Sequence, residues 1–317
     1  MNLIEIAVGK PSRARALALV GVRAGLRVLS AAAPPLAAAV AERLWFTPPP
    51  RRMRPGRAAL DSGHRMVRQV NGAPIVYWTW GGGPRVMLMH GWAGDASQLC
   101  GFVEPLLAAG FGVVTFDAPG HGESRVGRVW DRRVSFVDFA AAMKHASAAF
   151  GPVNCVVAHS SGCGAVGLAL RQGWRVERAV FLAPMAKPAA AAERFAQLLG
   201  LSARVMSMWQ TRAEQRLDFR WDELDLALVP KWANTPSVLV IHDRDDAEVD
   251  FSEGEAVAES WPEAELHATQ SLGHRRILRD RSVIDRAVVF LKAGLSIPKA
   301  QLDPPKNAAV GIDIADP

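Results

Sequence analysis

Two adjacent serines lie between an apolar run and a pair of glycines, in "VVAHSSGCGAV" at residues 156–166. A serine on a sharp strand-to-helix turn can attack a carbonyl carbon, because the turn exposes its hydroxyl. Such a turn requires small residues two positions before and two positions after the nucleophile. Ala158 and Gly162 meet this requirement for Ser160, whereas the corresponding neighbours of Ser161 are a histidine and a cysteine. We therefore predict Ser160 as the nucleophile, with a small-residue turn that has no chemistry as the alternative.

A tetrahedral intermediate on Ser160 would carry an oxyanion, which backbone N–H groups can stabilise. One donor would be the N–H of the residue after the nucleophile, Ser161. The other should come from the loop after an earlier strand, and "HGWAG" at residues 90–94 follows the apolar run 85–90. Trp92 is in the matching position. Its indole could also form part of a pocket wall.

The base that accepts the serine proton needs a buried carboxylate to orient it. "IHDRDDAEV" at residues 241–249 contains three aspartates at the end of an apolar run, Asp243, Asp245 and Asp246. We favour Asp246, which lies four residues after a histidine, and keep Asp245 as the main alternative.

The candidate base is His274, in "LGHRRIL" at residues 272–278. It follows a glycine on a predicted loop and can therefore reach into a site at the edge of a sheet. A serine, an aspartate and a histidine in this chain order are the arrangement expected on an α/β sheet. The other histidines have structural interpretations.

Alternating strands and helices from about residue 64 onward would position these side chains. An Asn71-Gly72 turn predicts a β-hairpin. The remaining predicted strands are 85–90, 112–118, 153–159, 178–184, 237–243 and 264–269, and the predicted helices are 96–110, 136–150, 164–172, 252–261 and 281–293. Alternation of this kind predicts an α/β fold, with a mostly parallel sheet and helices on both faces.

The alternation is interrupted at residues 188–233, where the pattern is helical and no run is typical of a strand. We expect a small helical cap over the carboxyl edge of the sheet, where ligands bind in open α/β folds. Met206, Met208 and Trp209 in this cap, together with Trp92, are the predicted apolar substrate pocket.

Residues 1–60 form a predicted basic helical extension, with ten Lys/Arg, two acidic residues and a net charge of +8. Two helices are expected, at 12–30 and 36–46, separated by Pro34-Pro35. The extension could pack on the main domain, or it could lie on anionic lipid as a basic amphipathic anchor. The tail at 297–317 has no periodicity and is predicted to be disordered.

Composition and charge disfavour several other classes of protein. Residues 61–317 sum to −2, and no zinc-finger spacing or aromatic-rich basic motif is present, so we expect no nucleic-acid partner. Three cysteines without paired spacing favour a reducing, cytoplasmic location, with contact at the inner membrane as the alternative. No metal-ligand spacing is found, and no cofactor is expected. High alanine and arginine usage is typical of GC-rich bacterial genomes.

The motifs also occur in the order and at the strand edges of a known family. "HGWAG", "FDAPGHGES" (116–124), "AHSSG", "IHDRDDAEV" and "GHRRIL" make residues 64–296 resemble an α/β-hydrolase-fold serine hydrolase of the bacterial esterase and lipase type. The resemblance implies a core of 61–187 and 234–296, a catalytic triad of Ser160, Asp246 and His274, and an oxyanion hole at Trp92 and Ser161. It also implies a structural role for the turn at 116–124.

The predicted function is hydrolysis of a small-molecule carboxylic ester through an acyl-enzyme on Ser160. A nucleophilic aspartate, typical of dehalogenases and epoxide hydrolases in this family, is not found at the elbow. A thioesterase, a lactonase or a perhydrolase could use the same three residues and remains an alternative. The physiological substrate and the oligomeric state are not predicted.

Overall fold

The computed structural model describes residues 13–48, 57–125 and 133–293. The predicted tail at 297–317 and all but the first two residues of the Pro/Arg-rich segment 47–56 lie outside the described residues.

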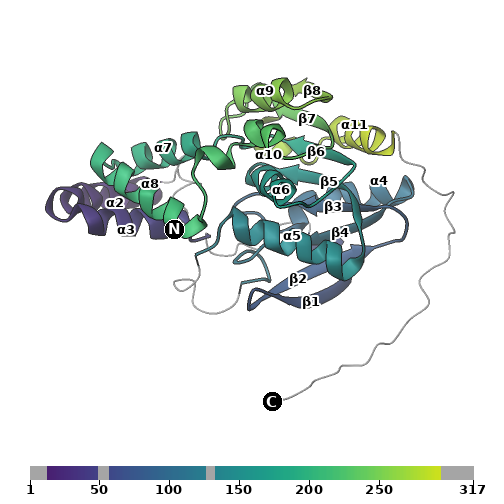
Figure 1. Ribbon diagram of the computed structural model, residues 1–317, viewed down its shortest axis with the longest axis horizontal. Coiled ribbons are helices and arrows are strands. Elements are labelled where there is room, and N and C mark those ends of the chain that lie inside the picture. Colours follow the sequence, from purple (N-terminus) through teal and green to yellow (C-terminus); the bar gives the residue numbers. More distant parts are fainter. Residues whose placement is uncertain (1–12, 49–56, 126–132, 294–317) are drawn as a thin grey trace, which may run out of the picture.

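Eight strands form one sheet in the order β1-β2-β4-β3-β5-β6-β7-β8 (Figure 1). Their bounds are β1 His64–Val70, β2 Ala73–Trp80, β3 Arg85–Met89, β4 Gly112–Phe116, β5 Val153–His159, β6 Arg178–Leu182, β7 Ser237–Asp243 and β8 Ala264–Thr269. Strand β2 runs antiparallel to both of its neighbours, β1 and β4. The other six strands, β3 to β8, are mutually parallel. The predicted mostly parallel sheet is confirmed.

The hairpin of β1 and β2 forms at the predicted turn. Asn71 and Gly72 both have positive φ, at 50° and 71°, as the two central residues of a type I′ turn require. This turn matches the right-handed twist of the strands that it joins.

Side chains of successive strand residues point to opposite faces of the sheet, and both faces carry apolar side chains. Helices cover both faces for this reason (Figure 1). On one face, Met87 and Val156 pack under α5 (Phe136–Phe150), α6 (Ser161–Arg171) and α9 (Phe251–Ser260). On the other face, Val86 and Val157 pack under α4 (Val103–Ala108) and α11 (Arg281–Lys292). The predicted helix at 96–110 begins as a 3₁₀ helix, Ala96–Phe102, and only then becomes α-helical.

The segment between β6 and β7 is helical, as predicted. It contains α7 (Pro188–Leu199), α8 (Ala203–Leu217) and two short 3₁₀ helices, Asp222–Leu224 and Leu226–Lys231. The N-terminal helices α2 (Arg13–Ala32) and α3 (Pro34–Trp45) form a hairpin, and α3 packs along α8 (Figure 1).

Glu42 on α3 connects this hairpin to the rest of the chain. Its carboxylate is 2% exposed and accepts hydrogen bonds from Arg133, Arg212 and Arg216 at 2.7–2.8 Å. Burial raises the pKa of Glu42, but the hydrogen bonds and charges of Arg216 and Arg212 lower it by a larger amount. The pKa of Glu42 therefore lies below its ordinary value. The carboxylate therefore stays charged and holds α3 against α8.

Candidate active site

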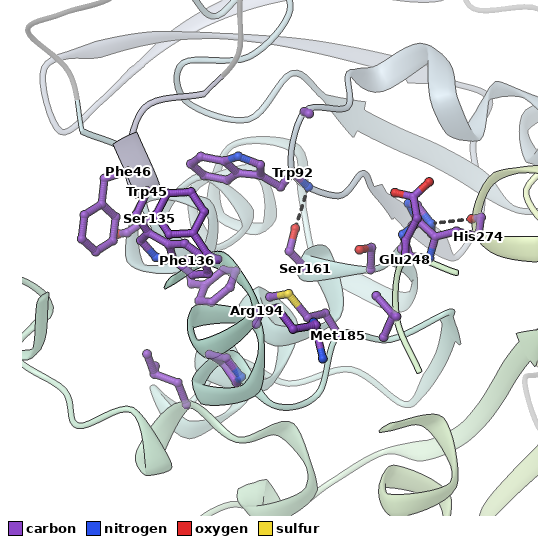
Figure 2. Close-up of a pocket in the computed structure, with 18 of the residues that line it drawn as sticks. Trp45, Phe46, Trp92, Ser135, Phe136, Ser161, Met185, Arg194, Glu248 and His274 are labelled. Carbon is purple, nitrogen blue, oxygen red and sulfur yellow. Dashed lines mark hydrogen bonds between the residues drawn. The ribbon is translucent and has the colours of Figure 1, made fainter. Parts of the chain in front are cut away.

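A cavity of about 240 Å³ lies at the carboxyl edge of the parallel strands, and α7 forms part of its wall (Figure 2). Ser160 follows β5, Trp92 follows β3 and His274 follows β8, and all three line the cavity. Because the carboxyl ends of parallel strands meet at one edge, loops far apart in sequence converge here.

Ser160 occupies a strained turn between β5 and α6. Its φ of 54° and ψ of −124° are rarely adopted by a residue with a side chain, and such strain is concentrated at functional sites. The hydroxyl does not cap α6, although Ser160 is the N-cap residue. Two residues later, a Cβ on Gly162 would lie 2.7 Å from the carbonyl oxygen of His90, so only glycine fits. The structure therefore requires a small residue two positions after Ser160, as the sequence argument for Ser160 assumed.

His274 and Asp246 form a hydrogen-bonded pair beside this serine. Nδ1 of His274 lies 2.7 Å from Oδ2 of Asp246, and both side chains are buried. With Nδ1 bound in this way, Nε2 is the nitrogen left to accept a proton from a hydroxyl in the cavity.

Asp246 is held by four groups. Oδ2 also lies 3.3 Å from Nε2 of His242, while Oδ1 accepts the backbone N–H groups of Glu248 and Val249 at 2.8 and 3.0 Å. Burial raises the pKa of Asp246, but the hydrogen bonds from His242 and His274 lower it more, so it lies well below its usual range. The carboxylate is therefore charged and fixed in orientation.

The two competing aspartates have other contacts. Asp243 accepts hydrogen bonds from the Thr269 hydroxyl and from the Leu272 backbone. Asp245 accepts one from the Ser271 backbone. Both carboxylates hold the loop before His274, so of the three only Asp246 contacts the imidazole.

His159 packs against the candidate base, His274. This contact was not predicted from the sequence. The rings of His159 and His274 lie 4.6 Å apart, and Nε2 of His159 donates to the backbone carbonyl of His274 at 3.1 Å. Burial, followed by the nearby His274, lowers the pKa of His159 well below its ordinary value. His159 therefore stays neutral and positions His274. Its place directly before the candidate nucleophile was the available sequence signal.

The predicted oxyanion donors, Trp92 and Ser161, are adjacent. The backbone N–H of Trp92 donates to the side-chain oxygen of Ser161 at 2.6 Å, as the dashed line in Figure 2 shows. Ser161 is also the first residue of α6, whose first N–H groups have no partner within the helix. Trp92 and Ser161 thus lie next to each other on the cavity wall.

The loop that carries Trp92 is fixed by the turn at 116–124. Nε2 of His121 accepts the Ala93 N–H at 3.2 Å, and the buried Asp117 accepts the Ala96 N–H at 2.7 Å. Ser124 donates from its hydroxyl to the Asp117 carbonyl. These contacts agree with the structural role predicted for this turn.

The cavity wall is mainly apolar, with several aromatic residues, and comes partly from the N-terminal hairpin. Trp45 and Phe46 at the end of α3 line it beside Phe136 (Figure 2). Phe195 and Trp221 also line it. The basic extension gave no sign of this role except the short "LWF" at 44–46.

The predicted pocket residues of the cap need correction. The cavity wall does not include Met206, Met208 or Trp209, whereas Trp92 does line it. Trp209 is fully buried one layer behind, with its ring 5.4 Å from that of Trp45 and 5.5 Å from that of Phe195. Helix α8 turns this face toward α3, so the N-terminal hairpin occupies the place expected for substrate.

The charged side chains on the cavity wall are paired with each other or with a neighbour. Arg194 binds the buried Glu253 at 3.1 Å, and Arg275 binds Glu248 at 2.8 Å. The wall therefore presents apolar surface and neutralised charges, which suits an uncharged apolar group.

Residues 13–48, 57–125 and 133–293 contain neither a cluster of metal ligands nor a helix suited to cross a membrane. In these ranges no group of three or more His, Cys, Asp or Glu residues could hold a metal ion. Among the helices described there, none has the length and apolarity needed to cross a bilayer.

Known proteins resemble this chain through a family model and through solved structures. Residues 84–238 match the family model described as serine aminopeptidase, S33. No curated protein matches the chain. The structure resembles an esterase from Pyrococcus furiosus, with a TM-score of 0.55 and 19% identity over 78% of this chain and 96% of the other.

Two further solved structures are similar. A bromoperoxidase from Bacillus anthracis has a TM-score of 0.54 and 19% identity over 72% of this chain and 99% of the other. A bacterial membrane phospholipase A has a TM-score of 0.55 and 16% identity over 88% of this chain and 97% of the other. At these identities the likeness establishes the fold.

Proposed function

The chain is an α/β-hydrolase-fold protein, and on that premise we propose that it is a serine hydrolase that cleaves small-molecule carboxylic esters. One observation carries the proposal: Ser160, at a strained strand-to-helix turn, lines the same cavity as His274, which is bound to Asp246 at 2.7 Å. A strained serine beside an oriented imidazole is the arrangement that activates a hydroxyl for attack on a carbonyl.

In the proposed reaction, Ser160 Oγ attacks the acyl carbon while His274 Nε2 takes its proton. Asp246 orients the imidazole and stabilises the positive charge that it gains. Backbone N–H groups of Trp92 and Ser161 stabilise the oxyanion, and each such donor contributes about 3 kcal/mol to lowering the barrier. His274 then gives the proton to the leaving alcohol, and a water molecule activated by the same base releases the acid.

The cavity supports an apolar acyl group of small or medium size. Its volume is about 240 Å³ and its wall is largely apolar. The arginines on its wall are paired with Glu253 and Glu248, so a charged acyl group would have to break an ion pair.

An ester panel on the wild type beside Ser160→Ala tests the proposal. We expect nitrophenyl esters of short and medium acids to be hydrolysed, with kcat lowered by roughly 10⁴-fold or more in the variant. Acyl-CoA, lactone and peroxide assays in parallel test thioesterase, lactonase and perhydrolase activity. Equal turnover by wild type and Ser160→Ala would refute the proposal, and rates that keep rising to long-chain triacylglycerols would refute the assigned acyl size.

A further inference from the structure

Helix α2 is apolar on two opposite faces. Leu19, Val22, Leu26 and Leu29 pack into the core, on the side where α2 contacts α3 and α7. On the other face, Leu17, Val20 and Val28 are 72%, 63% and 69% exposed. Gly21 and Ala24 lie between them and are also exposed, so the outer face is a continuous apolar stripe. Leu36, just after the turn to α3, is exposed as well.

Positive charge borders this stripe. The sequence of α2 contains four arginines and no acidic residue. Arg23 and Arg27 lie along one edge of the stripe, with their guanidinium groups beside Gly200 at the end of α7. Arg27 is exposed and Arg23 is half-buried. An exposed aliphatic stripe beside cations is the composition of helices that lie in the interface of an anionic bilayer.

We propose that the outer face of α2 docks on an anionic lipid surface. In the docked state the side chains of Leu17, Val20 and Val28 enter the boundary between headgroups and acyl chains, and Arg23 and Arg27 contact lipid phosphates. A second copy of this chain is a poorer occupant of the face, because pairing two such helices would bring arginines toward arginines.

The position of α2 in the fold gives this docking a consequence for the cavity. The α2–α3 hairpin lies at one end of the molecule, opposite α4 and α11 (Figure 1). Leu36 and Trp45 are at opposite ends of α3, about 14 Å apart along the helix axis. The same hairpin therefore offers an apolar face to lipid and a wall to the cavity, so docking would bring the cavity close to esters dissolved in the bilayer.

Co-sedimentation of the full chain with vesicles tests the proposal. Vesicles of phosphatidylglycerol and phosphatidylcholine are compared with vesicles of phosphatidylcholine alone, at low and high salt. The wild type should sediment with the anionic vesicles at low salt. Leu17→Asp/Val20→Asp/Val28→Asp should bind them at least about tenfold more weakly, since three buried aliphatic groups are lost. Arg23→Gln/Arg27→Gln should weaken binding about fivefold for each arginine.

Val289→Asp is the matched control. Val289 on α11 is 63% exposed, like Val20, but it is not part of the hairpin. It should sediment as the wild type does, and all variants should keep wild-type turnover of a soluble nitrophenyl ester and the wild-type melting temperature.

Three results would overturn the docking proposal. The wild type could fail to bind anionic vesicles, the triple aspartate variant could bind as tightly as Val289→Asp, or size-exclusion chromatography could show a dimer that this variant alone abolishes. Sedimentation needs no turnover, so the test is independent of the proposed reaction. Esterase activity without vesicle binding would refute the docking alone, and binding without esterase activity would refute the proposed function alone.

Discussion

The backbone N–H of Trp92 donates a 2.6 Å hydrogen bond to the side-chain oxygen of Ser161, the residue directly after the candidate nucleophile. The N–H expected to stabilise an oxyanion thus already has a neutral acceptor. An oxyanion is a charged and stronger acceptor, so it would take this N–H from the hydroxyl as negative charge develops. The hydroxyl holds the donor in place until that moment.

The two adjacent serines should therefore respond very differently to substitution. Ser161→Ala removes one neutral hydrogen bond and leaves its own backbone N–H intact. We expect kcat/KM for a nitrophenyl ester to change by no more than about tenfold, because such a bond contributes about 1 kcal/mol. Ser160→Ala in the same assay should lose nearly all activity. A loss in Ser161→Ala as large as in Ser160→Ala, at an unchanged melting temperature, would contradict these roles.

The N-terminal hairpin should influence acyl selectivity through Trp45. Trp45→Leu enlarges the cavity on the side of α3, so the ratio of kcat/KM for octanoyl over butyryl ester should rise several-fold. Initial rates across a series of nitrophenyl esters measure this ratio.

Trp209→Leu is the control for this effect. Trp209 packs in the same aromatic cluster but does not line the cavity, so the substitution should lower the melting temperature and leave the selectivity ratio unchanged. If both variants shifted the ratio equally, the cavity wall assigned to the hairpin would be wrong.

Glu42 should stabilise the docking of the hairpin. Glu42→Gln keeps the shape of the side chain but removes the charge that three partly exposed arginines contact. We expect a loss of about 2 kcal/mol in the free energy of unfolding at neutral pH, because one partner of a buried ionic cluster is lost while solvent screens the arginines. Since the folded-state pKa is lowered, the difference from wild type should shrink as pH falls below the ordinary glutamate value of about 4.3. Urea unfolding at neutral and acidic pH measures this difference in the free energy of unfolding. A variant as stable as wild type at neutral pH would refute the assignment.

His159 should make stability depend on pH in a different window. It stays neutral in the folded chain but binds a proton in the unfolded chain below about pH 6.5. The unfolded state therefore gains a proton as pH falls, and the free energy of unfolding should decrease by up to about 1.4 kcal/mol per pH unit from this residue. His159→Gln cannot titrate, so its unfolding free energy should fall less steeply below pH 6.5 than that of wild type. Parallel curves for the two proteins would be inconsistent with a buried neutral His159.

The parts of the fold that depend on local pattern could be read from the sequence. The strand runs are apolar and short, Asn71-Gly72 specifies its own turn, and Ser135 and Asp138 have the spacing of the capping box that they form at the start of α5. Chain order also predicted that His274 would meet the aspartate loop 243–246, because parallel strands end at a common edge, and spacing from a histidine favoured Asp246 over Asp245. The catalytic roles of His274 and Asp246 remain predictions.

The cavity wall could not be read in the same way. Trp209 and Met206 have the periodicity of an apolar helix face, but periodicity does not tell whether that face meets a cavity or another helix. Here α3 covers it, through a contact between residues 45 and 209 that no local pattern encodes. Glu42 was missed for the same reason, since its three arginines are distant in sequence. His159 was missed because the packing of its ring on His274 depends on the loop that follows β8.

Labelling with a fluorophosphonate followed by peptide mass mapping tests most directly whether Ser160 is the activated nucleophile. Such a probe forms a covalent bond only with a serine whose hydroxyl is activated. We expect one adduct, on the peptide that contains residues 156–166 and at Ser160, with labelling lost in Ser160→Ala, strongly slowed in His274→Ala and retained in Ser161→Ala. An adduct at Ser161, or no adduct on the folded wild-type chain, would contradict this expectation.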